Sequence, residues 1–290
     1  MSAIAALLAQ LARATLGEGA QLGGGGLELL VRRLGDRRDQ PDVKLFASFC
    51  RLFLRAYENY DYNIDRNGEA WLLKRLRPLR PKVVFDVGAN VGDWAVHAAV
   101  ALPEATIHAF EPVPDTYDAL ARSATSLPGR IIANASGLSD RDGAIALTVM
   151  ADDSTLSSIV KLHEGQGRQI ECAMRAGDAY MAEHGIDRID LLKIDVEGAE
   201  HMVLAGFARA LAEGRIDVIQ FEYGQANILT RFLLLDFHLL LESYGYSVGK
   251  LYPARVDFRS YRFEHEDFIG PNFVAVPAVR EDVKKLLTGT

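Results

Sequence analysis

The stretch at residues 83–92, VVFDVGANVG, limits most strongly what this chain can fold into. A short apolar run ends in a turn that contains Gly88 and Gly92, and apolar residues then recur at the spacing of one helical face. This order predicts a buried parallel strand, a tight turn and a helix. Glycines let backbone approach a ligand closely, and the first N–H groups of a helix favour polar or anionic groups. The turn therefore suits a nucleotide-like ligand.

Two alternatives stay open for this turn. One is a plain connection between strand and helix that binds nothing. The other is a nicotinamide dinucleotide site, whose fingerprint is Gly-x-Gly-x-x-Gly. This chain has Asn90 where the second glycine of that fingerprint belongs. The turn by itself does not decide its ligand.

The composition indicates a globular protein of enzyme size with one large or two modest domains. The chain has 290 residues, 49% of them hydrophobic, and its 32 basic and 39 acidic residues give a net charge of −7. Neither sign forms a long block, which disfavours non-specific nucleic-acid binding. Cys50 and Cys172 lie far apart without metal-ligand spacing, so both are expected to be buried free thiols.

The apolar runs predict neither a signal peptide nor a membrane span. No positive charge precedes the apolar residues 4–8, and their spacing is that of an amphipathic helix. The richest apolar run, 232–241, is short and contains Asp236 and His238. A cytoplasmic protein in a reducing setting is expected.

Two regions with different patterns divide the chain. Residues 1–80 are predicted to be a helical extension, with apolar stripes before Gly17, at 27–34 and around 46–53, and a break at the glycine run 23–26. These apolar faces have to be buried against the following domain or against another copy of the chain, so a homodimer is one expectation. In residues 81–290 strand-like and helix-like segments alternate, which predicts an α/β domain with a mainly parallel sheet.

The hydrophobic patterns place the elements of this domain approximately. Strands are expected near residues 83–88, 106–111, 130–135, 189–195, 216–223 and 271–277. Helices are expected near residues 91–102, 114–125, 176–185, 197–213 and 230–244. An added antiparallel pair is expected at 144–150 and 168–174.

Polar residues close the first three strands. Ligands of such sheets bind beyond the carboxyl ends of the strands, so these residues are candidates for a site. Asp86 and Gly88 close the first strand, and Glu111, which closes the second, follows Gly88 by 23 residues. A carboxylate there can take both hydroxyls of a ribose, or simply favour the start of a helix. Ser139 and Asp140, beyond the third strand, suit the edge of an adenine or an ordinary turn.

Charged residues end the fourth and fifth strands. Lys193, Asp195 and Glu197 share one side while the chain stays extended. Charges at the tip of an apolar strand are costly unless they are paired or used, and a Lys–Asp ion pair with a helix-capping acid is the alternative to a catalytic role. Glu222 closes the fifth strand and lies beside Asp195 if the two strands are neighbours.

A set of ordered motifs carries a family likeness. They are FDVGANVG at 85–92, FEP at 110–112, GLSD at 137–140, LKIDVEGAE at 192–200 with VLAG at 203–206, and NFVAV at 272–276. Together they resemble the S-adenosylmethionine-dependent methyltransferases of the FkbM type over roughly residues 82–277. The resemblance implies a Rossmann-like methyltransferase fold with a mostly parallel seven-stranded sheet whose last strand is antiparallel.

The same resemblance implies roles for the site residues. The amino-acid part of S-adenosylmethionine would be surrounded by residues of the glycine turn, namely Asp86, Gly88, Asn90 and Gly92. Glu111 would hold the ribose, and Ser139 or Asp140 would lie near the adenine. Asp195 would face the methionine end and the acceptor.

Methyl transfer to a hydroxyl needs a base close to the acceptor, because an alcohol is a poor nucleophile. Asp195, Glu197 and Glu222 are the catalytic candidates, with His201 as a further candidate that more often lies at a surface. Alternatively, Asp195 and Glu222 hold a divalent cation through oxygen ligands, although no metal site is predicted.

The acceptor is expected beneath the segments that precede the first and last strands. Their aromatic rings either stack on a sugar or pack, and their arginines either meet an acidic group or pair locally. The candidates are Tyr57, Tyr60, Tyr62, Trp71, Tyr252, Arg255, Phe258, Arg259, Tyr261 and Arg262.

The leading functional hypothesis is an O-methyltransferase acting on a hydroxyl of a sugar, glycan precursor or secondary metabolite. A nicotinamide-dependent oxidoreductase is one alternative, and Asn90 speaks against it. The other is a non-catalytic, cofactor-binding scaffold whose N-terminal helices recruit a partner.

Overall fold

The computed structural model describes residues 31–32, 34–149, 157–158 and 168–289. It contains two compact units, Met1–Tyr57 and Glu58–Thr290. In the first unit, helix α3 spans Pro41–Tyr57, where the sequence predicts a helix around residues 46–53. No residue of α3 is buried. The predicted stripe before Gly17 and the glycine run lie outside the described residues.

The second unit begins earlier than the boundary predicted at residue 80. Helix α4 (Glu69–Leu76) and the 3-10 helix η1 (Arg77–Leu79) belong to it. Three leucines of α4, at positions 72, 73 and 76, are at most 1% exposed and pack in the same core as strand residues. Burial of each leucine contributes about 1.5–3 kcal/mol, so this segment is part of the α/β core.

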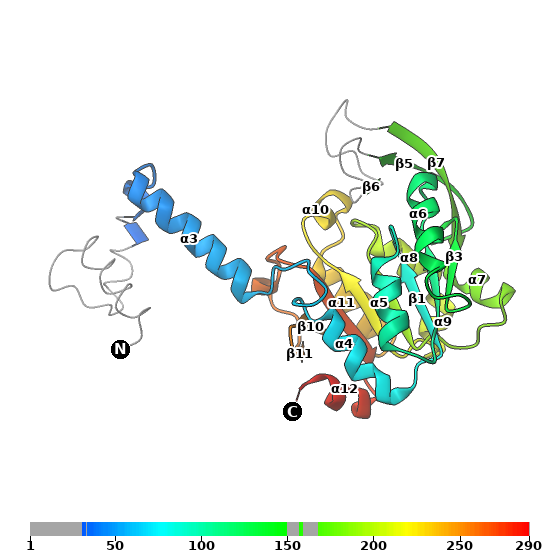
Figure 1. Ribbon diagram of the computed structural model, residues 1–290. Coiled ribbons are helices and arrows are strands. Elements are labelled where there is room, and N and C mark those ends of the chain that lie inside the picture. The colour runs from blue at the N-terminus through cyan, green and yellow to red at the C-terminus, as the bar shows by residue number, and fades with distance from the viewer. Residues whose placement is uncertain (1–30, 33, 150–156, 159–167, 290) are drawn as a thin grey trace. The chain divides into compact units, whose positions relative to one another are not determined.

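Eight strands of the described residues form the main sheet, in the order β11-β10-β12-β9-β8-β1-β2-β3 (Figure 1). Their bounds are Val83–Val87 for β1, Thr106–Phe110 for β2, Ile131–Asn134 for β3, Leu191–Ile194 for β8, Ile219–Glu222 for β9, Tyr246–Tyr252 for β10, Arg255–Phe258 for β11 and Asn272–Pro277 for β12. Strands β3, β2, β1, β8 and β9 pair in parallel, and β12 is antiparallel to β9. This confirms the Rossmann-like prediction, to which β11 adds an eighth strand.

Helices cover both faces of this sheet. Beyond α4, the described helices of the α/β unit are α5 Asp93–Ala101, α6 Pro114–Ala124, α7 Gly177–Glu183, α8 Glu200–Gly206, α9 Ala208–Ala212, α10 Ala226–Thr230, α11 Leu234–Ser243, α12 Glu281–Leu287 and the 3-10 helix η2 Phe263–His265. Two helices, α8 and α9, take the place of the single helix predicted near 197–213. The helix is interrupted at the buried Phe207, which lies between them. The prediction near 230–244 corresponds to α11.

Side chains of the central strands alternate between two cores. Val84 and Leu191 pack with α4 and α5, whereas Phe85 and Leu192 pack with α7, α8 and α9. Since side chains alternate with a period of two, Asp86 and Lys193 lie on the α4 and α5 side. The carboxyl end of the sheet therefore presents polar groups on one face.

A second, smaller sheet has the order β4-β7-β5-β6. Its strands are Gly137–Ser139 (β4), Gly143–Val149 (β5), Ser157–Ser158 (β6) and Arg168–Ala176 (β7). The antiparallel pairing of β5 with β7 confirms the pair predicted at 144–150 and 168–174. Cys172 on β7 is a buried free thiol, whereas Cys50 is free but only half-buried.

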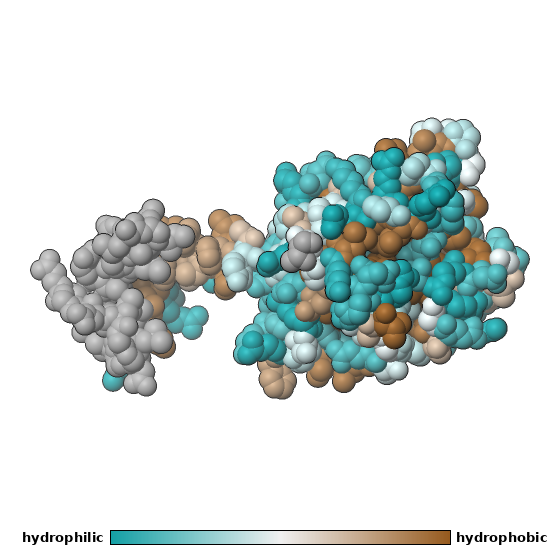
Figure 2. All heavy atoms as spheres, turned by 90° about the horizontal axis from the view of Figure 1, so that it is seen from below, coloured by the Kyte–Doolittle hydropathy of each residue, from teal (hydrophilic) through white to brown (hydrophobic). Residues whose placement is uncertain are grey.

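The surface displayed in Figure 2 mixes hydrophilic and hydrophobic residues over the larger unit. Within the residues that the structure describes, no helix combines the length and the apolar character needed to cross a bilayer.

The buried His108 on β2 should lower the free energy of unfolding in acid. His108 is 6% exposed, with its ring Nδ1 2.9 Å from the Tyr180 hydroxyl, and burial together with the nearby His184 lowers its pKa to about 4. A group with a lowered pKa stabilises the fold above its unfolded pKa of about 6.5, and that contribution is lost as the pH falls towards 4. We expect a loss of about 3 kcal/mol from this residue, measured by urea unfolding between pH 7 and 4. His108→Gln should show a shallower slope, and an unchanged slope would contradict the assignment.

Candidate active site

A cavity of about 870 Å³ opens where β1, β2, β8 and β9 end, between α4 and α5 on one side and the second sheet on the other. Seven of the predicted site residues line it: Gly88, Asn90, Glu111, Ser139, Asp195, Glu197 and Glu222. Three others do not. Asp86 is fully buried beneath the cavity, Gly92 is the N-cap of α5, and Asp140 accepts a hydrogen bond from Ser139 at 3.1 Å.

The N–H groups of the glycine turn are mostly occupied by protein acceptors. Those of Gly88 and Ala89 donate to the Phe110 carbonyl at 3.1 and 2.9 Å. The Asn90 N–H donates to Glu111 at 3.1 Å, and the Gly92 N–H donates to the Ala89 carbonyl at 2.8 Å. These four N–H groups of the turn, which precede the first turn of α5, are already satisfied within the protein and offer an anion little.

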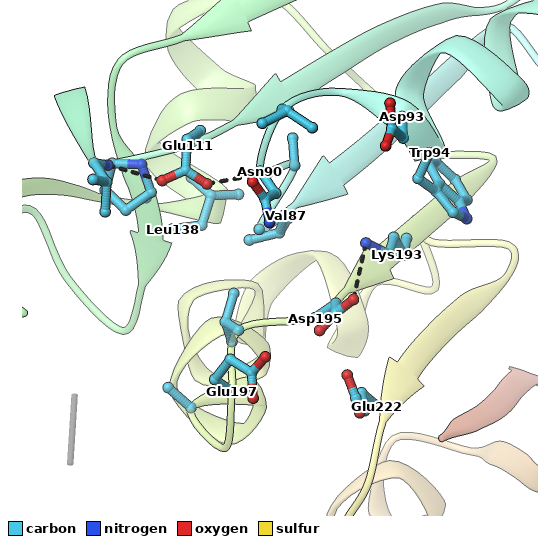
Figure 3. Close-up of a pocket in the computed structure, with 18 of the residues that line it drawn as sticks. Val87, Asn90, Asp93, Trp94, Glu111, Leu138, Lys193, Asp195, Glu197 and Glu222 are labelled. Carbon is cyan, nitrogen blue, oxygen red and sulfur yellow. Dashed lines mark hydrogen bonds and ion pairs between the residues drawn. The ribbon is translucent and has the colours of Figure 1, made fainter. Parts of the chain in front are cut away.

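Glu111 is held at the end of β2 by two backbone donors. Its carboxylate accepts the N–H of Asn90 and, at 2.9 Å, the N–H of Val113 (Figure 3). The side chain is buried, and burial raises its pKa while the two N–H groups lower it. An ionised carboxylate has about four lone-pair sites, so two remain for a ligand.

A buried ion cluster lies under the cavity. The Lys193 ammonium group is 3.2 Å from Asp86 and 3.3 Å from Asp195, with its side chain only 6% exposed. It also lies 5.6 Å from the ring centroid of Trp94. Desolvation lowers the pKa of Lys193, but the two carboxylates outweigh that effect and raise it overall. The predicted Lys–Asp pair is therefore present, with Asp86 as a second anionic partner.

Asp195 and Glu222 meet at the tips of adjacent strands. β8 and β9 pair in parallel with Ile194 opposite Phe221, which brings the next two residues side by side, as predicted (Figure 3). Each of the two carboxyl groups shifts the pKa of the other. Burial and the Asp195 charge raise the pKa of Glu222 well above its usual value. Burial also acts to raise the pKa of Asp195, but Lys193 and the neighbouring Glu222 lower it overall. The pKa values of the two groups are therefore pushed apart, that of Glu222 upwards and that of Asp195 downwards.

Glu197 reaches the cavity by a different route from the one predicted. β8 ends at Ile194, and Glu197 has a φ of 54° in the turn that follows, so strand alternation no longer applies to it. His201 points elsewhere: its ring stacks on Phe232 at 4.6 Å and does not line the cavity.

Comparison with known proteins agrees with this arrangement. The sequence profile described as the Methyltransferase FkbM domain matches residues 86–248, more than half of the chain. The chain belongs to the FkbM methyltransferase family.

Two curated relatives illustrate the FkbM family. The hexuronic acid methyltransferase AglP of Haloferax volcanii is 29% identical over 142 residues, which cover 49% of this chain and 56% of the relative. The 31-O-demethyl-FK506 methyltransferase FkbM of Streptomyces tacrolimicus is 34% identical over 159 residues, which cover 44% and 60%. The chain thus spans less than two thirds of either relative. A crystal structure of methyltransferase FkbM from Methylobacillus flagellatus aligns with a TM-score of 0.44 at 18% identity, covering 67% of this chain and 43% of that one.

Several residues that line the cavity of this FkbM family member were not predicted from the sequence. Glu69 on α4 and Asp93, Trp94 and His97 on α5 all line the cavity. Asn90 Oδ1 and Trp94 Nε1 are buried, and neither has a hydrogen-bond partner among the described residues. The sequence feature that could have identified Asp93, Trp94 and His97 is their position in the first turns of the helix that follows the glycine turn.

Of the ten residues predicted to contact the methyl acceptor, one lines the cavity and nine do not. Tyr62 lines the cavity together with residues 63–65. The other nine candidates do not: Tyr57, Tyr60, Trp71, Tyr252, Arg255, Phe258, Arg259, Tyr261 and Arg262. Arg255 instead lies over the Tyr252 ring, and Arg259 pairs with Asp257 at 3.6 Å. Among the described parts of the chain, no group of three or more His, Cys, Asp or Glu is arranged to hold a metal ion.

Gly88 is predicted to be irreplaceable by alanine. Its φ is +82°, and an added Cβ would lie 1.8 Å from the Asp195 carbonyl oxygen, so β1 and β8 would have to separate at the site. Gly129 is a matched control, because its φ is +75° but nothing lies within 4 Å of its added Cβ. Both alanines incur about 1–2 kcal/mol of backbone strain. Gly88→Ala should lose about 2 kcal/mol more by overpacking, measured by urea unfolding. Equal losses in the two variants would refute this account.

Proposed function

We propose that this protein is an S-adenosylmethionine-dependent O-methyltransferase whose acceptor is an uncharged hydroxyl compound such as a sugar, a glycan precursor or a secondary metabolite. The main support for this proposal is the negative charge of the cavity. Seven acidic residues line it: Asp65, Glu69, Asp93, Glu111, Asp195, Glu197 and Glu222. Among the described lining residues, Lys193 supplies the one full positive charge, and it is already paired.

Such a cavity suits a positively charged cofactor. The pyrophosphate of a nicotinamide dinucleotide needs N–H groups or cations, whereas the N–H groups of the turn are occupied and the wall is acidic. The sulfonium of S-adenosylmethionine is a cation and has no such need. Its ribose diol matches the two remaining lone-pair sites of Glu111, and its polar groups match the unpartnered Asn90 Oδ1.

The site residues would then divide the work. When bound, S-adenosylmethionine supplies an electrophilic methyl group on a positively charged sulfur. Glu111 and Asn90 would hold the cofactor, and Ser139 would lie towards its adenine. Asp86 and Gly92, which do not line the cavity, would support the turn from below. Asp140 would act only through its hydrogen bond with Ser139.

The Asp195–Glu222 pair is the proposed base, with Glu197 beside it. Asp195 is held ionised by Lys193 and lines the cavity, so its carboxylate can accept the proton of an acceptor hydroxyl. With the pKa of Glu222 raised and that of Asp195 lowered, Glu222 would carry a proton and Asp195 would not, so uptake of the acceptor proton by Asp195 makes the pair neutral while the acceptor oxygen becomes nucleophilic. Alignment of that oxygen with the methyl group supplies a further part of the rate. A divalent cation at this pair stays an alternative.

The acceptor is expected to be uncharged for the same electrostatic reason. An anionic acceptor would meet like charges from Asp65, Glu69 and Asp93, which is unfavourable in a partly desolvated cavity. The relative AglP is named for a hexuronic acid, so a difference in acceptor charge is proposed between the two proteins.

Calorimetry and a transfer assay test the proposal. The intact protein should bind S-adenosylmethionine but not NADH, and it should transfer a radiolabelled methyl group to a neutral sugar panel rather than to the matching uronic acids. No binding of S-adenosylmethionine would refute the cofactor, and a preference for uronic acids would refute the acceptor charge.

The oxidoreductase alternative has one motif in its favour, a Tyr-x-x-x-Lys spacing at Tyr246 and Lys250. Both residues lie on β10 outside the cavity. The Tyr246 hydroxyl donates to the Ile216 carbonyl at 2.8 Å, and Lys250 donates to Glu58 at 3.0 Å. These structural contacts and the family membership favour methyl transfer.

The remaining proposals concern the setting of the protein. The two free cysteines support a reducing, cytoplasmic environment. A homodimer through the N-terminal helices is proposed from the exposed apolar side chains of α3, such as Leu45 and Leu52.

A further inference from the structure

Glu200, the first residue of α8, is a buried carboxylate without an assigned role. It is 1% exposed, and its Oε1 accepts the N–H of Val196 at 3.1 Å and the N–H of Gly198 at 3.0 Å. These two donors flank Glu197 in the loop that carries Asp195. Through these two hydrogen bonds, the buried Glu200 side chain fixes the backbone of the loop that follows β8.

Asn227 ties the same carboxylate to the loop that follows β9. Its Nδ2 donates to Glu200 Oε2 at 3.2 Å, and its Oδ1 accepts the Gly224 N–H at 2.9 Å. Asn227 is 2% exposed, and Gly224 lies two residues beyond Glu222. Glu200 and Asn227 thus form one bridge between the chain segments that follow Asp195 and Glu222.

The two loops also touch directly at this bridge. An added Cβ on Gly198, whose φ is +97°, would lie 2.9 Å from the Ala226 carbonyl oxygen. Glu197, next to Gly198, has a left-handed φ of 54°. This conformation costs a non-glycine residue about 1 kcal/mol or more, and it persists only where the surrounding contacts hold it. The two N–H bonds to Glu200 on either side of Glu197 supply those contacts.

We propose that Glu200 and Asn227 are positioning residues that hold together the loops following Asp195 and Glu222, and so keep the carboxyl groups of these two residues close enough to interact. This rests on the proposed function only in that the pair is the base there. Without the bridge, the pairing of β8 with β9 still places Asp195 beside Glu222, but the loops that follow can move apart and change the distance between the two carboxyl groups. The interaction between the two carboxyl groups then weakens, and each titrates closer to its usual pKa.

The titration of the pair is the direct readout, because a purely structural role for the bridge would leave it unchanged in a folded variant. Glu222 faces Asp195, Glu197 and Glu200 from the β8 side and Tyr62 from the segment before α4. Lys193 faces Asp195 from below. Glu200 also titrates, because burial raises its pKa to about 7. The signals of these carboxyl groups are assigned by single substitution.

Three variants separate position from charge. Asn227→Ala removes the bridge and keeps the Glu200 charge. Glu200→Gln keeps the acceptor for both N–H groups but turns an amide donor towards Asn227, so one bridge contact is lost whichever way Asn227 turns. The double variant Glu200→Gln/Asn227→Asp exchanges donor and acceptor and restores every hydrogen bond at unchanged net charge. Gln225→Ala, an exposed neighbour in the second loop, is the control.

Carbon-13 NMR of the side-chain carboxyl groups measures the outcome in the full chain, with circular dichroism to verify folding. In Asn227→Ala and in Glu200→Gln, the Glu222 midpoint should fall towards the usual value of about 4.3 and the Asp195 midpoint should rise towards about 3.9. The double variant and Gln225→Ala should titrate like the unmodified protein. Unchanged midpoints in a folded single variant would overturn the proposal, as would a folded double variant that fails to restore them.

The two single variants are independent, so the test stands if one of them does not fold. Binding of S-adenosylmethionine, followed by calorimetry on the unmodified protein, tests the proposed function separately. A protein that binds no S-adenosylmethionine but shows the expected titrations would refute the function and leave the bridge intact.

Discussion

Replacing Glu111 with alanine is expected to weaken the binding of S-adenosylmethionine by about 100-fold or more, because each hydrogen bond to a charged acceptor contributes about 1.5–3 kcal/mol and a ribose diol makes two of them. The carboxylate is fixed before any ligand arrives, since the N–H groups of Asn90 and Val113 hold it at 3.1 and 2.9 Å. Isothermal titration calorimetry measures the effect directly.

Two control variants make the Glu111 experiment specific. Glu111→Gln keeps the shape and one acceptor oxygen, so its loss should be smaller than that of Glu111→Ala. Glu104→Ala removes a glutamate that pairs with Arg80 and Lys82 at the surface, and it should leave the affinity unchanged. A folded Glu111→Ala protein with nearly unaltered affinity would show that this carboxylate does not hold the cofactor.

The pairing of Asp195 with Glu222 was predictable because parallel strands end at the same edge of a sheet. The sequence placed both residues at strand ends, and the register that puts Ile194 opposite Phe221 brings them together. The position of Glu111 followed from the same rule. Predictions of this kind depend only on the period of a strand and the order of the strands, and both are local or topological properties.

The prediction failed where the chain leaves a strand. Strand alternation placed Glu197 beside Lys193, but β8 ends at Ile194 and the turn at Glu197 is left-handed. Similarly, Ser139 lines the cavity while Asp140 does not. In turns the direction of a side chain depends on dihedral angles that hydrophobic patterns do not encode.

Strand β10 was missed because its stability depends on distant partners. Ser247, Gly249 and Lys250 interrupt the apolar residues of this segment, and a lysine with 1% of its side chain exposed is unfavourable unless it is paired. Its ammonium group bonds Glu58, which lies 192 positions away, and the Ile269 carbonyl. The role of Glu69 was hidden for the same reason, since it accepts a hydrogen bond at 2.6 Å from Gln220, which lies 151 positions away.

Replacing Lys193 with methionine is expected to destabilise the α/β unit by about 3–5 kcal/mol, because removing one partner of a buried ion pair leaves an uncompensated charge. Asp86 is fully buried, and neither of its carboxyl oxygens has a hydrogen-bond partner among the described residues, so the lysine 3.2 Å away is its main stabilising contact. The melting temperature should fall by roughly 10 °C, as measured by calorimetry.

Adding Asp86→Asn to Lys193→Met should restore much of the lost stability, because the double variant leaves no buried anion at position 86. Lys82→Met is the control, since Lys82 pairs with Glu104 at the surface and such pairs contribute about 0–1 kcal/mol. The deficit of Lys193→Met should also shrink as the pH falls. Burial already raises the pKa of Asp86 and Lys193 counteracts that rise, so without the lysine the protonated carboxyl group favours the folded state at low pH. A Lys193→Met deficit that is independent of pH and persists in the double variant would mean that the lysine stabilises the unit by packing, and that Asp195 is held ionised by something other than this cation.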